Sequence, residues 1–492
     1  MLLRPCVRRV CHELPRPTLR SNTRFYSSFS RGDDKPYYLT TPIFYPNSVP
    51  HIGHLYTLVT TDILARHARL SRPDRTVSFL TGTDEHGLKI QRAAEAQNSK
   101  PLEFCDRISD RFRVLAGKVD ASYTRFIRTS ENDHHYAVQH VWRELDSKGL
   151  IYKGSHKGWY SISDECFYTD NQEVVVSKET GSVVEWTEEE NYKFRLSNFR
   201  DFLLARYQSD PHAIHPPQQH ANVLDMLSVP LEDLSVSRPR HRLHWGIASG
   251  YPWNVEKERI ESCWPPDLQV VGKDIVRFHA IYFPAMLQAL DLPHPKRLLA
   301  HSHWTVNRRK MSKSIGNVVD PFQTIDELGA DPVRYYLARI GGRFKDDVDF
   351  QSCSRETLEQ STDVEKLIEV VDPLKSLAAV VDNHLEELRI GEALEAIISQ
   401  LKAANAMMNA TEPWAKDTPQ ALIGEVYTLS LETLRVCGIL LQPFIPAKAR
   451  MLLDAMSISP SERSLQHARY LPGTVSSARP GVKLFSRMRY AI

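Results

Sequence analysis

The sequence predicts an α/β protein: a Rossmann-type parallel-sheet domain with a small inserted β-rich element, followed by a C-terminal α-helical bundle. Three observations support this. A strand–helix–strand pattern opens the folded sequence, a stretch of alternating aromatic and polar residues interrupts it, and strand patterns stop beyond about residue 350. Because 492 residues are too many for one ordinary core, two or three domains are expected.

The first strand is predicted at 37–41, where aromatic and β-branched residues cluster. Several prolines then break the pattern into a loop, and the spacing of apolar residues from His54 onward predicts a helix. A second strand at 76–80 ends in the segment 81–84. Since these elements form a βαβ unit, the sequence implies a parallel sheet with a ligand crevice at the strand ends.

Later segments complete the predicted order. Residues from about 150 to 200 suggest the β-rich insertion, and strand and helix patterns return at 268–271 and 278–290. Apolar residues at helical spacing between 422 and 434 predict the final bundle. The helical pattern at 364–377 is expected to be interrupted by Pro373.

Composition excludes several classes. The formal net charge is only +2, so any RNA contact must come from local basic patches. No stretch reaches the roughly 18 apolar residues that a membrane span needs. The seven cysteines form no C-x-x-C pair, which argues against a zinc knuckle and a disulfide framework.

The first thirty residues are rich in arginine and carry one acidic residue, Glu13. This composition is typical of an organellar transit peptide, and a disordered basic tail is the alternative. Cleavage near 27–33 is expected.

The first motif that carries chemistry is His51-Ile52-Gly53-His54, where the first strand's loop turns into a helix. A helix N-terminus with two imidazoles suits a triphosphate, and Gly53 would let a purine lie against the backbone. Two ordinary histidines at a helix start are the alternative.

The second motif is Lys310-Met311-Ser312-Lys313-Ser314. Two lysines among small hydroxyl residues form a cationic loop suited to pyrophosphate. Taken alone, a solvated basic loop is an equally good interpretation.

Together, the two motifs resemble the HIGH and KMSKS elements of class I aminoacyl-tRNA synthetases. The segments around them are similar to methionyl-tRNA synthetase over most of residues 37–350. These segments are 41–47, 81–87, 242–247, 271–279 and 301–307.

The resemblance implies a role for each matching residue. The implied ATP-binding residues are His51, Gly53, His54, Asp274, His301, Lys310, Ser312 and Lys313. Within this set, His51 and His54 bind phosphates, while Lys310 and Lys313 stabilise the leaving pyrophosphate, so catalysis is positioning plus electrostatics.

The implied methionine-binding residues are Ile43, Tyr45, Asp84, Arg238, Ile275 and His279. Asp84 would hold the α-ammonium group and Arg238 would brace the site. Ile43 and Ile275 fit an ordinary core equally well, and Tyr45 and His279 fit satisfied interior polar groups. Asp84 is harder to explain structurally, because a carboxylate at a strand's carboxyl end lies where such folds bind ligands.

In the helical part, Glu412-Pro413-Trp414 resembles the segment whose tryptophan stacks on an anticodon base. From the residues alone, packing of Trp414 on the bundle is the better interpretation. The interval between the two motifs leaves no room for a large editing domain. Cys166 is the one cysteine in 159–170, which resembles the zinc-free mitochondrial form.

Two segments expected from the family are missing. Ile247 runs directly into 248–253, without the aromatic segment that walls the methionine side chain. After Phe350, the sequence lacks a helix that helps to read the anticodon.

The resemblance therefore implies a mitochondrial transit peptide at 1–32, a catalytic domain at 33–350 with a connective insertion at about 131–210, and an anticodon-binding domain at 351–492. The expected function is ligation of methionine to tRNA(Met) by ATP through methionyl-adenylate. We expect a monomer of the mitochondrial matrix, with Mg²⁺ accompanying ATP, no structural zinc and no membrane. The alternative is a non-catalytic tRNA-binding relative, or a truncated form that lacks part of the methionine pocket.

Overall fold

The computed structural model describes most of the chain between the predicted leader and the C-terminal tail. The described ranges are 35–161, 166–168, 184–247, 263–306, 309–310, 319–344, 347–349 and 365–471. The leader, the junction directly after Ile247, the junction after Phe350, and the residues Ser312 and Lys313 lie outside them.

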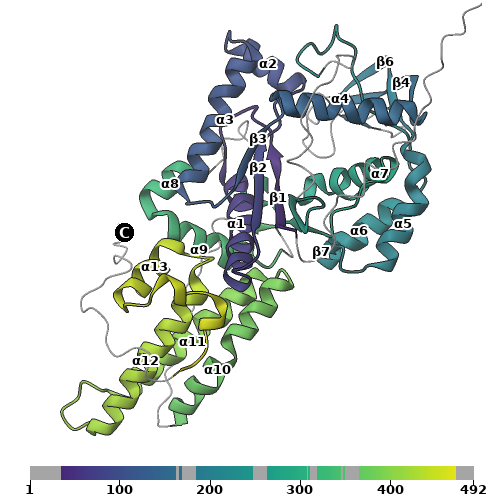
Figure 1. The fold of residues 1–492 in the computed structure, drawn as a ribbon. Coiled ribbons are helices and arrows are strands. Elements are labelled where there is room, and N and C mark those ends of the chain that lie inside the picture. The colour runs from purple at the N-terminus through teal and green to yellow at the C-terminus, as the bar shows by residue number, and fades with distance from the viewer. Residues whose placement is uncertain are drawn as a thin grey trace, which may run out of the picture.

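A six-stranded parallel sheet forms the centre of the molecule, in the order β3-β2-β1-β9-β10-β7 (Figure 1). Its strands are β1 (Tyr37–Phe44), β2 (Val77–Thr83), β3 (Arg125–Arg128), β7 (Ile214–His215), β9 (Leu268–Gly272) and β10 (Arg297–His301). Because β1 pairs with both β2 and β9, the strand order reverses beside β1. The predicted Rossmann-type sheet is confirmed, and such reversals are where ligands bind in open α/β sheets.

Helices lie between these strands along the chain, and two more, α8 (Pro321–Leu328) and α9 (Ala330–Gly341), follow the last of them. Those between the strands include α1 (Ile52–Ser71), α2 (Leu88–Ala96), α3 (Pro101–Lys118) and α7 (Phe283–Ala289). The helix predicted from His54 begins at Ile52, because His51 supplies its N-cap. The helix predicted at 278–290 is two elements, a π-helical turn at Phe278–Tyr282 followed by α7.

The β-rich insertion lies at the opposite end of the molecule from the helical bundle (Figure 1). Its antiparallel sheet has the order β5-β4-β6-β8. The insertion contains α4 (Asn132–Ser147), β4 (Ile151–Ser161), β5 (Cys166–Tyr168), β6 (Val184–Phe194) and α5 (Arg200–Ser209). After β7 of the central sheet, the chain forms α6 (Pro217–Ser228) and β8 (Leu234–Ser235), which adds the last strand to the antiparallel sheet. A third sheet is formed by β11 (Trp304–Val306), β12 (Arg309–Lys310) and β13 (Val348–Asp349).

The C-terminal bundle is formed by α10 (Glu365–Glu386), α11 (Ile390–Thr411), α12 (Gln420–Leu441) and α13 (Pro446–Ala455), as predicted. The expected interruption at Pro373 is wrong, because α10 continues through it. The helix accommodates this proline at an exposed position, although a proline removes one backbone hydrogen bond. Across the described ranges, no helix is both long and apolar enough for a membrane span.

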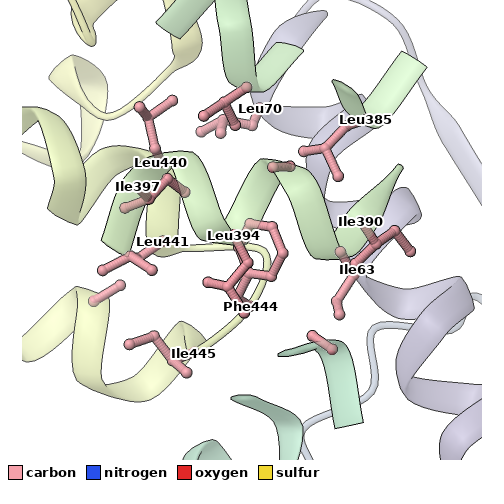
Figure 2. Close-up of a cluster of buried hydrophobic side chains, with 14 of the residues drawn as sticks. Ile63, Leu70, Leu385, Ile390, Leu394, Ile397, Leu440, Leu441, Phe444 and Ile445 are labelled. Carbon is pink, nitrogen blue, oxygen red and sulfur yellow. The ribbon is translucent and has the colours of Figure 1, made fainter. Parts of the chain in front are cut away.

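One apolar core continues from the sheet through α1 into the bundle. Figure 2 shows its junction, where Ile63 of α1 faces Ile390 and Leu394 of α11, with Phe444 beside them. All four side chains are at most 1% exposed. The bundle is therefore packed on the sheet domain as part of its core.

A buried ion pair lies in the same junction. Asp62 of α1 and Arg334 of α9 are 2.7 Å apart, and neither side chain is exposed. Burial by itself would raise the pKa of Asp62, but Arg334, Arg66 and the hydrogen bonds from Ser122 hold it below its ordinary value. Asp62 is therefore ionised at neutral pH.

We expect the substitution Asp62→Asn to lower the free energy of unfolding by about 3–5 kcal/mol, because it leaves the Arg334 charge buried without its counter-ion. Urea unfolding of the full chain measures the change. As a control, Glu103→Gln in the exposed Lys100–Glu103 pair should cost at most about 1 kcal/mol. Equal effects of the two substitutions would contradict the assignment.

Candidate functional site

The candidate site lies at the carboxyl ends of β1, β2, β9 and β10. His51 and His54 follow β1, Asp84 follows β2, Asp274 follows β9, and His301 ends β10. These strands are neighbours in the sheet. Residues that are far apart in the sequence therefore meet at one edge, as the βαβ pattern predicted.

The two histidines cap α1 reciprocally. Nδ1 of His51 accepts from the backbone N–H of Gly53 at 3.0 Å, and the backbone N–H of His51 donates to Nδ1 of His54 at 3.1 Å. Because each Nδ1 is an acceptor, the proton of each neutral ring is on Nε2. The helix N-terminus thus carries two imidazole N–H donors beside its own positive dipole end, which suits an anionic ligand.

Packing fixes both rings. Their centroids are 3.8 Å apart, and the His54 ring meets Phe44 and Phe112 edge to face. Gly53 makes this arrangement possible, since a Cβ at this position would lie 2.9 Å from Cε1 of His51. The glycine is thus required for the histidine cap, whatever its role in binding a purine.

His301 lies under α1 and is 4% exposed. Its Nδ1 is 2.9 Å from the Ser302 carbonyl oxygen, which can only accept, so Nδ1 carries the proton. Its Nε2 then accepts from the Thr57 hydroxyl at 2.7 Å. Burial lowers the pKa of His301 to about 4. The neutral ring therefore joins the end of β10 to α1.

Asp84 lines a cavity of about 850 Å³ between the sheet edge and the insertion. Its backbone N–H donates to the Phe44 carbonyl oxygen at 2.8 Å, and its carboxylate is 3.5 Å from the Thr129 hydroxyl. Beside it, Glu85 is fully buried and forms a bidentate pair with Arg128 at 2.7 and 2.9 Å. That pair fixes the turn after β2, so the position of Asp84 is set by its neighbour.

Arg238 lines the same cavity as Asp84, on the loop after β8. Its guanidinium donates to the Ser235 hydroxyl at 2.9 Å and lies 3.6 Å from the carboxylate of Glu189. Glu189 also accepts from Arg242 at 3.0 Å. The buried Glu189 of β6 therefore ties the arginine-rich loop to the insertion.

The remaining methionine-site candidates also line the sheet edge. Ile43 pairs with Gly82 of β2, and Tyr45 packs partly buried against the cluster around α2 and α3. Ile275 and His279 follow β9, where Nδ1 of His279 is 3.0 Å from the Ile275 carbonyl oxygen. Burial lowers the pKa of His279, so the ring is neutral. The π-helical turn that begins at Phe278 is a feature frequent at functional sites.

Three candidates remain: Asp274, Lys310 and Trp414. Asp274 is 3.1 Å from Nε2 of His303. Lys310 is in β12, and its backbone pairs with Thr305 of β11. Trp414 lies between α11 and α12, away from the sheet, and its side chain is 63% exposed. Exposure of this degree contradicts packing of Trp414 on the bundle.

Sequence reasoning missed several supporting residues. Glu85 and His86 stand inside the quoted segment 81–87, so the motif itself could have pointed to them. Nε2 of His86 is 3.1 Å from the Thr129 carbonyl oxygen, and its ring lies 5.3 Å from that of Trp245. Glu189 gave no signal, because it is one of three consecutive glutamates in a strand.

One cluster in the described ranges brings metal-ligand atoms within 4.8 Å of one another: His67, Asp382 and Glu386. It lies where α1 meets α10. Nε2 of His67 bonds Asp382 at 2.8 Å, and Glu386 is paired with Arg72 at 3.0 Å. These side chains therefore form contacts between two helices.

Comparisons with known proteins agree with this geometry. A family described as tRNA synthetases class I (M) matches residues 37–179 and 253–360. A probable mitochondrial methionine–tRNA ligase of Neurospora crassa is 40% identical over 539 aligned positions, covering 94% of this chain and 86% of the relative. The mitochondrial methionine–tRNA ligase of Homo sapiens is 39% identical, covering 91% and 89%.

A solved structure is similar over the same length. Mycobacterium tuberculosis methionyl-tRNA synthetase in complex with methionyl-adenylate has a TM-score of 0.82 at 33% identity, covering 92% of this chain and 100% of that chain. The alignment with the Neurospora relative is longer than the 492 residues of this chain. That relative therefore has segments that this chain lacks.

The buried His301 predicts an acid-sensitive fold. Its pKa is about 4 in the folded chain and about 6.5 in the unfolded chain, so the unfolded state binds more protons between these values. The contribution of His301 to stability is full above about pH 6.5 and is lost as the pH falls toward 4. We expect a loss of about 2 kcal/mol from this residue between pH 7 and pH 5.

Urea unfolding at pH 7 and at pH 5 measures this loss. The variant His301→Gln keeps hydrogen-bonding groups but does not titrate. In this variant, the difference in the free energy of unfolding between pH 7 and pH 5 should be smaller by about 2 kcal/mol. An unchanged difference would contradict the burial of a neutral His301.

Proposed function

The chain belongs to the methionine–tRNA ligases, class I synthetases of mitochondrial type, and from this premise we propose that it joins methionine to tRNA(Met) by way of methionyl-adenylate. The observation that carries the proposal is that His51, His54, Asp84 and Asp274 follow neighbouring strands of the central sheet, while Arg238 of the insertion lines the same cavity as Asp84. Imidazole N–H groups that can donate to phosphate oxygens, and a carboxylate that can bind an ammonium group, thus follow neighbouring strands of the sheet.

In the first step, a methionine carboxylate oxygen attacks the α-phosphorus of ATP, and the bond to pyrophosphate breaks. We infer that the Nε2–H donors of His51 and His54 bind phosphate oxygens as charge shifts during the attack. Asp274 and His301 would shape the adenosine side. Lys310, Ser312 and Lys313 would hold the pyrophosphate, whose charge is also balanced by Mg²⁺ brought with ATP.

Methionine would bind between β1, β2 and β9. Asp84 pairs with the α-ammonium group, and Arg238 braces the cavity wall through Glu189. Ile43 and Ile275 give apolar contacts. Tyr45 and a neutral His279 complete the set, because uncharged groups suit a thioether.

In the second step, a terminal ribose hydroxyl of the tRNA attacks the carbonyl carbon of methionyl-adenylate, and AMP leaves. The exposed Trp414 would stack on an anticodon base. In this proposal, residues 33–350 form the catalytic domain with the insertion at about 131–210, and residues 351–492 bind the anticodon.

The setting is also proposed from the family. Relatives named as mitochondrial enzymes support import into the mitochondrion, with residues 1–32 as the transit peptide and the matrix as the site of action. We propose that the protein acts as a monomer without structural zinc.

Methionine-dependent exchange between ATP and pyrophosphate tests the first step directly. Protein that begins near Ser30 should catalyse exchange, and Lys313→Ala should lower it at least about 100-fold, because charge stabilisation at the leaving group is lost. Lys416→Ala, at an exposed lysine beside Trp414, is the matched control and should leave exchange unchanged.

The outcomes separate the two functions that the sequence allows. Exchange that depends on Lys313 means that the site closes although segments present in relatives are missing. Folded protein that binds tRNA without any exchange would refute the enzyme and favour the non-catalytic tRNA-binding relative.

Trp414→Ala should raise the KM for tRNA about 5- to 150-fold, since stacking of one base on an aromatic ring is worth about 1–3 kcal/mol. Exchange should not change. The control is Trp186→Ala, which removes a tryptophan of similar exposure (60%) from the insertion. If both substitutions affect the KM for tRNA equally, Trp414 has no special place in anticodon binding.

A further inference from the structure

Arg334 heads the largest fully buried side chains of the described residues. It lies on α9, and its side chain bonds both Asp62 of α1 and Phe444 of the bundle. The proposed reaction gives this residue no chemical role. Its place in the fold therefore needs a separate explanation.

The guanidinium of Arg334 joins three parts of the chain. Nη1 pairs with Asp62 of α1 at 2.7 Å and donates to the Val119 carbonyl oxygen, at the end of α3, at 3.1 Å. Nη2 donates to the Pro443 carbonyl oxygen at 2.8 Å, and Nε donates to that of Phe444 at 3.0 Å. Pro443 and Phe444 form the turn between α12 and α13.

The guanidinium bonds α1 on one side and the turn that follows α12 on the other. These two helices extend toward the histidine cap and toward Trp414, respectively. Asp62 lies eight residues beyond His54 on α1, so the histidine cap is about 12 Å away along the helix axis. On the other side, α12 has 22 residues and spans about 33 Å. It begins close to Trp414 in sequence and ends at the turn that Arg334 binds.

Only an arginine can satisfy this set of acceptors. Its planar fork directs three nitrogens to four oxygen atoms from three segments, whereas a lysine offers one nitrogen on a flexible chain. At the side of the junction, Arg72, directly after α1, pairs with Glu386 of α10, and both side chains are about half exposed. Exposed pairs of this kind constrain geometry weakly.

We propose that Arg334 is a positioning residue that fixes α12 relative to α1, so that a tRNA bound at the far end of the bundle presents its 3′ end to the adenylate. This inference rests on the proposed function. If the joint loosens, the tRNA still binds the bundle, but the effective concentration of its 3′ end at the adenylate falls. Adenylate formation does not use the bundle and is unaffected.

The test is Arg334→Lys in the full chain, with exchange and aminoacylation measured side by side. We expect kcat for exchange and the KM for tRNA to stay within about threefold, while kcat for aminoacylation of whole tRNA falls at least about tenfold. A hairpin RNA that carries only the acceptor stem should be charged at the same rate by both proteins, because it does not bind the bundle.

Arg435→Lys is the matched control. Arg435 is a buried arginine that pairs with a buried carboxylate, Glu432, and donates to the His467 carbonyl oxygen, but all its partners belong to the C-terminal part. We expect Arg435→Lys to lower the Tm about as much as Arg334→Lys does, but to leave the ratio of the aminoacylation rate to the exchange rate unchanged. Asp62→Asn, which cuts the link to α1 and keeps the carbonyl contacts, should show the same split as Arg334→Lys.

The results also separate this inference from the proposed function. Absence of exchange in the unsubstituted protein refutes the proposed function. With exchange present, equal losses of exchange and aminoacylation in Arg334→Lys would overturn the positioning role. The positioning role is also overturned if Arg435→Lys lowers aminoacylation while exchange is kept. If Arg334→Lys does not fold, Asp62→Asn takes its place in the test, and equal effects of Asp62→Asn on exchange and aminoacylation would overturn the role.

Discussion

The buried pair of Asp62 and Arg334 is the contact on which the arrangement of the molecule depends. Bringing both charges out of water costs several kcal/mol for each ion, so the pair persists only because further groups bond it. Ser122 and Arg66 bond the carboxylate, and three backbone carbonyls accept from the guanidinium. The pair therefore adds little net stability by itself, but it accepts only one relative position of α1, α9 and the bundle.

The histidine cap at the start of α1 also follows from the need of polar groups for hydrogen-bond partners. A helix start must satisfy free N–H groups, and here the two imidazoles do so through Nδ1. That requirement leaves each Nε2 as a donor and fixes the rings beside the positive end of the helix. Local folding rules thus prepare an anion site before any ligand binds, and His301 at the end of β10 bonds Thr57 of the same helix.

Much of this could be predicted from the sequence. Strand, helix and turn patterns are local, so the parallel sheet, the insertion and the bundle followed from them, and the motifs placed the site at the sheet edge. Pro373 was misjudged because its exposure depends on packing. The role of Arg334 had no signal at all, since one arginine in a helix is ordinary until distant segments surround it. The tie between Glu189 and Arg238 was hidden for the same reason.

The central claim is that α1 and the bundle form one cooperative unit around Asp62 and Arg334. Native-state amide hydrogen exchange tests it most directly, because it gives an opening free energy for each helix. We predict that the central amides of α1, α9 and α12 open with the same free energy, equal to that of global unfolding. Exchange of α12 at a clearly lower free energy, while α1 stays protected, would contradict the claim.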